Sequence, residues 1–308
     1  MASIDLEKMR QKIKDTQWAL VDFDWESPGA EKITAKQWPK LKTFMADLMW
    51  IEHVGARGFA ALAKSAPTEN LREIYTYFHA EEQRHANAEM ALMKRWGMLE
   101  ENESPVPSAN LRLVIEWLER YADDTPFNLL ATLIPMLEVA LDGALCKYLL
   151  ETVDDPLCHK VFAKINDDES RHLGVGFTVM EMQGKGPHYI KLIQLLGHLV
   201  DPRLIAGAMV YFPLLNSMRD NLIAMGMEEE KLYRSMEKFK KIGGRTSQGR
   251  RNPWFQVIHY HGTIMVNRSN YFYHVPVDML VALSNKIPRR LLPAPPSWVA
   301  ELTHRPIA

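Results

Sequence analysis

Two short motifs in the chain combine a carboxylate and an imidazole at the spacing of one helical turn. Glu82 stands three residues before His85, and Glu169 stands three residues before His172. Residues three apart share one face of an α-helix, so each pair can offer an oxygen and a nitrogen to the same point. One such pair is common on a solvated helix face. Their repetition favours a shared site, and these ligand types suit iron or manganese better than structural zinc.

Each motif also has a glutamate upstream at a matched distance. Glu52 precedes Glu82, and Glu138 precedes Glu169, by nearly the same number of residues. A helical hairpin of two equal arms would return both carboxylates of a pair to one height. Two such hairpins packed together predict a metal site in a bundle core with these ligands: Glu52, Glu82, His85, Glu138, Glu169 and His172.

Both hairpins place these ligands on apolar stripes. Glu52 shares its helical face with Leu48 and Phe59, and Glu82 follows Phe78 by one turn. A buried, unpaired carboxylate is costly, and metal ligation would offset that cost. Gly55 would leave space beside the metals for O2 or a substrate chain, or simply allow close helix packing.

The exact register on the second helix stays open at this stage. Glu81, His79 and Glu89 are nearby alternatives, and we choose Glu82 because its motif repeats at Glu169. A metal-bound imidazole usually donates its other N–H to a carboxylate. We therefore expect Asp168 to hold His85 and Glu81 to hold the other histidine, although either carboxylate could instead lie on the surface.

Asp142 is the candidate catalytic residue, one turn after Glu138 on the same helical face. It could deliver protons in an oxygen pocket, or it could be an orienting or solvated carboxylate. Pro135 and Gly143 flank this turn, and an internal proline distorts a helix by removing a backbone hydrogen bond.

Start and stop signals divide the chain into three parts. We expect an N-terminal cap at 1–33, a four-helix bundle at 34–183, and further helices with a Pro-rich strap at 184–308. The predicted bundle helices cover 34–63, 68–96, a third from 126 and 155–184, with a crossover helix at 110–121 between the hairpins. Residues 22–29 would cover a bundle end or act as a substrate lid.

The C-terminal part gives weaker functional signals. We expect helices at 188–200, 202–225, 228–241 and 277–285, the first two of which could line a substrate tunnel, and an extended strap at 288–296. The basic run at 238–251 would be a solvated loop or would dock an acidic partner such as a carrier protein, an acyl-CoA phosphate or a reductase. His259 and His261 could suggest a second metal site, but alternate residues without further ligands are weak evidence.

Bulk composition narrows the classes of protein. The 308 residues carry a net charge of −1 and are 47% hydrophobic, which permits a sizeable core and gives no general attraction to nucleic acid. The chain has only two cysteines, which fits a reducing cytoplasm. It shows no apolar signal core and no apolar run of about 18 residues, so we expect a cytoplasmic protein without a transmembrane segment.

These motifs resemble the ferritin-like superfamily of di-metal carboxylate proteins over about residues 34–183. Residues 81–85 (EEQRH) and 168–172 (DESRH) are similar to the paired motifs of soluble acyl-carrier-protein desaturases, and 168–177 is similar to a helix of the aldehyde-deformylating oxygenases. The chain departs from desaturases at Leu141 and lacks, at Ile165, the additional histidine of the arylamine N-oxygenases.

The resemblance implies an all-α fold, a ferritin-like four-helix bundle with additional C-terminal helices. It also implies two Fe ions, or a Mn/Fe pair, with Glu82 and Glu138 bridging and with Glu52 and Glu169 terminal or shifting. The expected function is a di-iron oxygenase or desaturase that uses O2 and an external electron donor on a small organic or acyl substrate. A homodimer is compatible with this reading.

Two other hypotheses remain at this stage. The first is a ferroxidase-type or non-enzymatic iron protein, and the second is a helical scaffold without metals. The apolar stripes favour a lipid-like substrate, although packing alone also needs them.

Overall fold

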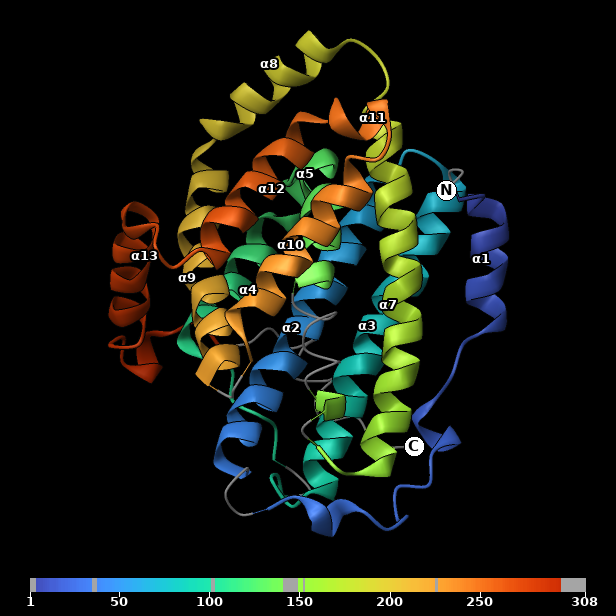
Figure 1. Ribbon diagram of the computed structural model, residues 1–308, viewed down its shortest axis with the longest axis vertical. Coiled ribbons are helices and arrows are strands. Elements are labelled where there is room, and N and C mark those ends of the chain that lie inside the picture. Colours follow the sequence, from blue (N-terminus) through green and yellow to red (C-terminus); the bar gives the residue numbers. More distant parts are fainter. Residues whose placement is uncertain are drawn as a thin grey trace.

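A computed structural model describes residues 4–34, 38–100, 103–140, 149–151, 153–224 and 227–294, and the secondary structure of these residues is entirely helical (Figure 1). The predicted all-α class is therefore confirmed. Asp142, Leu141, Gly143 and one of the two cysteines, Cys146, lie outside the described residues.

Two helical hairpins form the bundle. The first joins α2 (Trp38–Ser65) to α3 (Glu69–Arg95), and the second contains α5 (Phe127–Ala140) and α7 (Pro156–Gln183), with the crossover helix α4 (Ala109–Tyr121) between them. The predicted caps are present: the Thr68 hydroxyl accepts from Leu71 N, and Asp155 accepts from Leu157 N ahead of Pro156. Gly97, at φ +68°, follows the end of α3.

Small residues let the bundle helices approach closely. A Cβ atom at Gly176 of α7 would lie 2.4 Å from Cγ of Pro135, so the internal proline of α5 packs directly against this glycine. α5 is helical on both sides of Pro135 up to Ala140. This contact fixes the separation of the two helices at the turn that carries Glu138.

The N-terminal residues lie along the bundle as well as across its end. α1 (Leu6–Asp15) runs beside α3 and α7 (Figure 1), where Arg10 pairs with Glu73 at 2.9 Å. Two 3-10 turns follow, η1 (Leu20–Asp22) and η2 (Ala30–Lys32). Between them, the carbonyls of Trp25 and Ser27 accept from Arg95, at the end where α3 finishes and α7 begins.

The C-terminal helices cover the other side of the bundle. They are α8 (His188–Leu199), α9 (Pro202–Ala224), α10 (Glu229–Gly243), α11 (Ser247–Arg250), α12 (Pro253–Val266) and α13 (Tyr271–Ser284). α10 and α12 pack on α5, α9 packs on α4, and α13 lies outside α9 (Figure 1).

α12 was not predicted, and α13 begins six residues before the helix predicted at 277–285. Asn252 caps α12 by accepting from Trp254 N, and Pro253 occupies its first turn, so a start signal was present. Both helices are rich in aromatic residues and lack a continuous polar face, which hid their periodicity.

The chain end is fastened to the crossover helix. Arg112 of α4 donates to the carbonyls of Leu292 and Pro293, just after the turn η4 (Arg289–Leu291). The predicted strap is thus an anchored segment as far as residue 294, and Pro295 and Pro296 lie outside the described residues. None of the described helices is long and apolar enough to cross a membrane.

Candidate metal centre

All six predicted ligands meet in the core of the bundle. α2 contributes Glu52, α3 contributes Glu82 and His85, α5 contributes Glu138, and α7 contributes Glu169 and His172. Each of these residues is at most 5% exposed. Carboxylates concentrated at such depth need compensation by protons, hydrogen bonds or cations.

The ligand atoms form two overlapping groups of four. One group contains Glu52, Glu82, His85 and Glu169; the other contains Glu82, Glu138, Glu169 and His172. Within each group the candidate atoms lie within 4.8 Å of one another. The two groups share the glutamates of the repeated motifs.

This geometry can be compared with the bridging roles that the family resemblance implies. Glu82 and Glu138 were expected to bridge, and Glu52 and Glu169 to be terminal or shifting; in the structure Glu82 and Glu169 belong to both ligand groups, whereas Glu52 and Glu138 each belong to one. The reason is positional: α3 and α7 carry the two motifs and face each other across the core, so their glutamates meet between the groups. The bridging and terminal roles toward the metals stay predictions.

Each histidine is oriented by the carboxylate that the sequence predicted. His85 Nε2 donates to Asp168 Oδ2 at 3.0 Å, and His172 Nε2 donates to Glu81 Oε2 at 3.0 Å. Each bond crosses between α3 and α7. It leaves Nδ1 of both rings facing the glutamates, with His85 Nδ1 3.2 Å from Glu169 Oε1.

The residues behind these carboxylates were not predicted. Trp18 Nε1 donates to Asp168 at 2.8 Å, and Gln17 Nε2 donates to Glu81 at 2.7 Å. Arg171 donates to both carboxylates. The arginine had a readable signal, since it occupies the same place as Arg84 in the repeated motif. Residues 17 and 18 had none, because they follow α1 far away in sequence.

Several polar atoms of the centre have no hydrogen-bond partner within the described part of the chain. They are Nδ1 of both histidines, both oxygens of Glu138 and Oε2 of Glu169. Buried polar atoms in native proteins are normally satisfied. These atoms come together from three helices, α3, α5 and α7, so a set of cations between them would satisfy all of them at once. The residues present therefore fit a pair of metal ions.

The pKa shifts of the buried carboxylates and histidines indicate that the centre needs added positive charge. Burial raises the pKa of Glu82 well above its usual range, and the charges of Glu52 and Glu169 raise it further. Although burial opposes it, the hydrogen bond to Asp168 and the nearby carboxylates of Glu169 and Glu52 raise the pKa of His85 well above its ordinary value. Without metals, protons on the imidazoles thus balance the carboxylates; metal binding would displace them.

Glu89 is a further buried carboxylate that the ligand groups do not include. It lies on α3 one turn after His85, is completely buried, and neither of its oxygens has a hydrogen-bond partner among the residues described. Burial, followed by the charge of Glu52, raises its pKa well above normal. The other register alternative, His79, bonds the carbonyl of Ala56 instead.

Aromatic rings line the centre on the side of His172. The ring of Phe78 lies 4.1 Å from that of His172, and Phe59 lies 5.1 Å away, between centroids. The space at Gly55 is filled rather than open, because a Cβ there would lie 2.3 Å from Glu82 Oε2. Gly55 therefore serves the carboxylate, which fits the packing alternative.

The remaining candidates do not join this site. His261 stacks on Phe212 and bonds the Tyr273 hydroxyl at 3.1 Å, whereas His259 bonds Thr263, so the described residues show no second metal group there. The structure leaves the predicted catalytic role of Asp142 untested.

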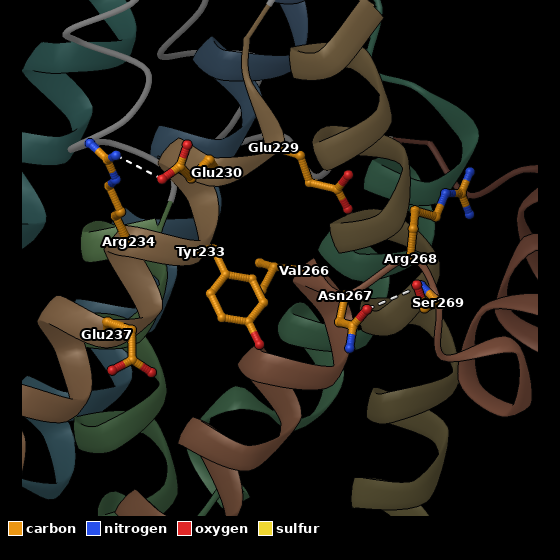
Figure 2. A pocket seen from close by; sticks show the side chains of 9 residues that line it. All are labelled: Glu229, Glu230, Tyr233, Arg234, Glu237, Val266, Asn267, Arg268 and Ser269. Carbon is orange, nitrogen blue, oxygen red and sulfur yellow. Dashed lines mark hydrogen bonds and ion pairs between the residues drawn. The ribbon is translucent and has the colours of Figure 1, made fainter.

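A surface pocket of about 460 Å³ lies between α10 and the loop before α13. Figure 2 shows that Tyr233 stands at its centre, with Glu229 and Arg268 on its rim. None of the six candidate ligands lines it, and neither α8 nor α9 contributes to it. It therefore gives no support to the predicted substrate tunnel.

Comparisons with known proteins identify a fold and no sequence family. No protein-family model matches the chain, and no curated protein matches it. A solved structure of an R2-like ligand-binding oxidase variant with an Fe/Fe cofactor is 14% identical, with a TM-score of 0.50, and the match covers 86% of this chain and 94% of that one. A variant with a Mn/Fe cofactor is 14% identical with a TM-score of 0.45, covering 92% and 93%. The chain has the all-α, ferritin-like fold of the first of these R2-like oxidases.

Proposed function

We propose that this protein is a di-metal oxidoreductase that activates O2 and acts on a small organic or acyl substrate. The observation that carries the proposal is the pair of overlapping ligand groups, in which two buried glutamates are shared. The similar solved structures are titled as oxidases with Fe/Fe or Mn/Fe cofactors, which supports iron, or manganese with iron, as the metals. An external electron donor and a cytoplasmic location belong to the same proposal.

The residues divide the work of holding two ions. Glu52 and His85 would bind one ion, Glu138 and His172 the other, and Glu82 and Glu169 would contact both. Two such ions held close together would supply the electrons that reduce O2. The exchange of protons for metal predicts that affinity falls as pH decreases.

The surrounding residues prepare the site for this chemistry. Asp168 and Glu81 fix the ring orientation of the histidines and raise the basicity of Nδ1. The buried rings of Phe59 and Phe78 exclude water on the His172 side. A dry wall of this kind favours an apolar substrate, and it also packs the bundle.

The first test is elemental analysis of the protein grown with iron, for the wild type and for the double variant His85→Ala/His172→Ala. We expect about two metal ions per chain in the wild type and almost none in the double variant. The pair His188→Ala/His198→Ala on α8, outside both ligand groups, is a matched control and should retain both ions. Equal metal content in all three proteins would contradict the proposal.

Measurement of O2 consumption then distinguishes an oxygenase or desaturase from a ferroxidase-type protein. An oxygenase or desaturase should consume O2 with an electron donor and faster in the presence of an organic substrate. A ferroxidase-type protein should oxidise added ferrous iron at the same rate with or without substrate. If the protein binds both metal ions but only oxidises ferrous iron at a rate independent of substrate, the metal site is supported and the proposed oxidation of an organic substrate is rejected.

A further inference from the structure

The helix α8 presents an unusually apolar outer face. Its exposed large hydrophobic residues recur at helical spacing and continue onto α9; they are Tyr189, Ile190, Leu192, Ile193, Leu196, Leu199, Val200, Ile205 and Met209. Tyr189 and Ile193 are each 65% exposed and Val200 is 73% exposed, whereas Leu195 alone is buried on α8. Contiguous exposed apolar residues of this number mark a protein–protein or membrane interaction site more often than an ordinary monomer surface.

α8 lies at one end of the molecule and is attached by few contacts. It packs against α12, where His198 lies against the ring of Trp254 at 5.7 Å, and against the start of α9 (Figure 1). Nothing in the described residues covers its outer side.

Basic residues gather around the beginning of this helix. The His188 ring bonds the carbonyl of Arg251 at 2.9 Å, which places α11 directly beside the start of α8. Gly184, at the end of α7, is also packed against α11, since a Cβ there would lie 1.8 Å from the carbonyl oxygen of Gln248. The exposed side chains at this junction include Lys185, Lys240, Lys241, Arg250 and Arg251.

Acidic residues are missing from the same region of sequence. Residues 182–200 and 238–277 contain no aspartate or glutamate, although the whole chain has a net charge of −1. The acids that flank the first segment are already paired: Glu181 binds Arg245 at 3.0 Å, and Asp201 binds Arg203 at 2.8 Å. Basic residues therefore outnumber acidic residues at this end, where Glu237, one turn before Lys240 and Lys241, is the nearest further acid in sequence.

We propose that α8 and the basic junction at α11 form a docking surface for an anionic lipid bilayer. The apolar stripe would enter the boundary between headgroups and acyl chains, while the lysines and arginines contact the negative headgroups. Charge decides between this partner and a second copy of the chain. A second copy would bring a further set of basic residues to the interface, whereas anionic lipid supplies the opposite charge. The proposal stands on this surface alone and does not depend on the metal centre.

The test is co-sedimentation of the full-length protein with vesicles of phosphatidylcholine alone or of equal parts phosphatidylcholine and phosphatidylglycerol. We expect at least about tenfold tighter binding to the mixed vesicles, decreasing as salt is added. Ile193→Asp should weaken this binding about tenfold or more, because it places a charge in the apolar stripe. Arg250→Glu/Arg251→Glu should weaken it by a similar factor.

Matched controls lie on other surfaces. Phe272→Asp on α13 removes an aromatic ring that is 98% exposed, and Lys8→Glu on α1 reverses an exposed charge. Both should bind vesicles like the wild type, and circular dichroism should show that every variant is folded.

Three outcomes would overturn the proposal. They are equal binding to both kinds of vesicle, no binding to either, and equal loss of binding in Phe272→Asp and Ile193→Asp. Light scattering on the same samples identifies the rival occupant, since a dimer that Ile193→Asp dissociates, without vesicle binding, would assign the face to a second copy.

Discussion

The molecule contains two buried polar clusters that differ in how their charges are satisfied. In the bundle, carboxylates from four helices face two histidines, and several oxygens and nitrogens lack hydrogen-bond partners among the described residues. In the C-terminal helices, Arg219 donates to the carbonyl of Met265 at 2.8 Å and approaches His274 Nδ1 at 3.1 Å. His274 in turn donates to the Asn267 carbonyl at 2.9 Å.

The difference separates a structural cluster from a ligand-binding one. Around Arg219, a single cation finds acceptors within the chain; in this cluster the only buried side-chain atom without a partner, as far as the structure is described, is Oδ1 of Asn216. In the bundle, acceptors outnumber donors, so the folded chain needs added protons or cations. Burial alone therefore does not identify a site; an excess of unsatisfied acceptors does.

The largest expected effect concerns the shared glutamates. Glu169→Gln should remove both metal ions, because Glu169 belongs to both ligand groups, whereas Glu52→Gln should remove about one, because Glu52 belongs to a single group. Metal content per chain measures the difference. The exposed Glu229→Gln is the control and should keep both ions. An equal loss in Glu169→Gln and Glu52→Gln would show that the two groups do not act as separate sites.

The next effect concerns the buried cluster around Arg219. Arg219→Leu should lower the free energy of unfolding by about 3 kcal/mol, because it leaves His274 and the Met265 carbonyl without their buried donor. Metal content per folded chain should not change. Denaturant unfolding provides the measurement, with Arg203→Leu as the control: its ion pair with Asp201 is at the surface, so its loss should change the stability little. Similar losses in both variants would contradict the view that Arg219 is the core of the cluster.

A smaller effect is expected at Glu89, which shares the apolar surroundings of the metal centre without belonging to either group. Glu89→Gln should stabilise the metal-free protein at neutral pH by about 1–2 kcal/mol, because it removes a buried carboxylate without a described partner. Thermal unfolding of the chelator-treated protein measures this. Metal content should remain that of the wild type; a lower metal content would instead make Glu89 part of the centre.

The last effect lies where the two regions meet. Asn221 of α9 donates to Asp47 of α2 at 3.3 Å, and burial raises the pKa of Asp47 to about 6. Because the folded state holds the proton more tightly than the unfolded state, the contribution of Asp47 to stability is present below about pH 4 and is lost as pH rises to about 6. Asp47→Asn should therefore be more stable than the wild type at pH 7, by no more than about 3 kcal/mol, and equal to it near pH 4. A difference between the two proteins that does not change with pH would rule out this titration.

The sequence by itself determined the helical class, the four bundle helices to within a few residues, the six ligand candidates and the pairing of Asp168 with His85 and of Glu81 with His172. These followed because helical periodicity and a repeated spacing are local properties of the chain, and because a buried carboxylate is costly enough to need an explanation. Local signals were insufficient for α12, whose capping residues were present but whose aromatic-rich surface lacked a polar face.

Only the tertiary structure decided which glutamates are shared, since that depends on which helices face each other across the core. The same is true of Trp18 and Gln17, which reach Asp168 and Glu81 from a segment remote in sequence. It is also true of the exposed side of α8, whose apolar composition would otherwise have indicated a buried helix. In each case the deciding contacts join residues far apart in the chain, and no local pattern specifies such contacts.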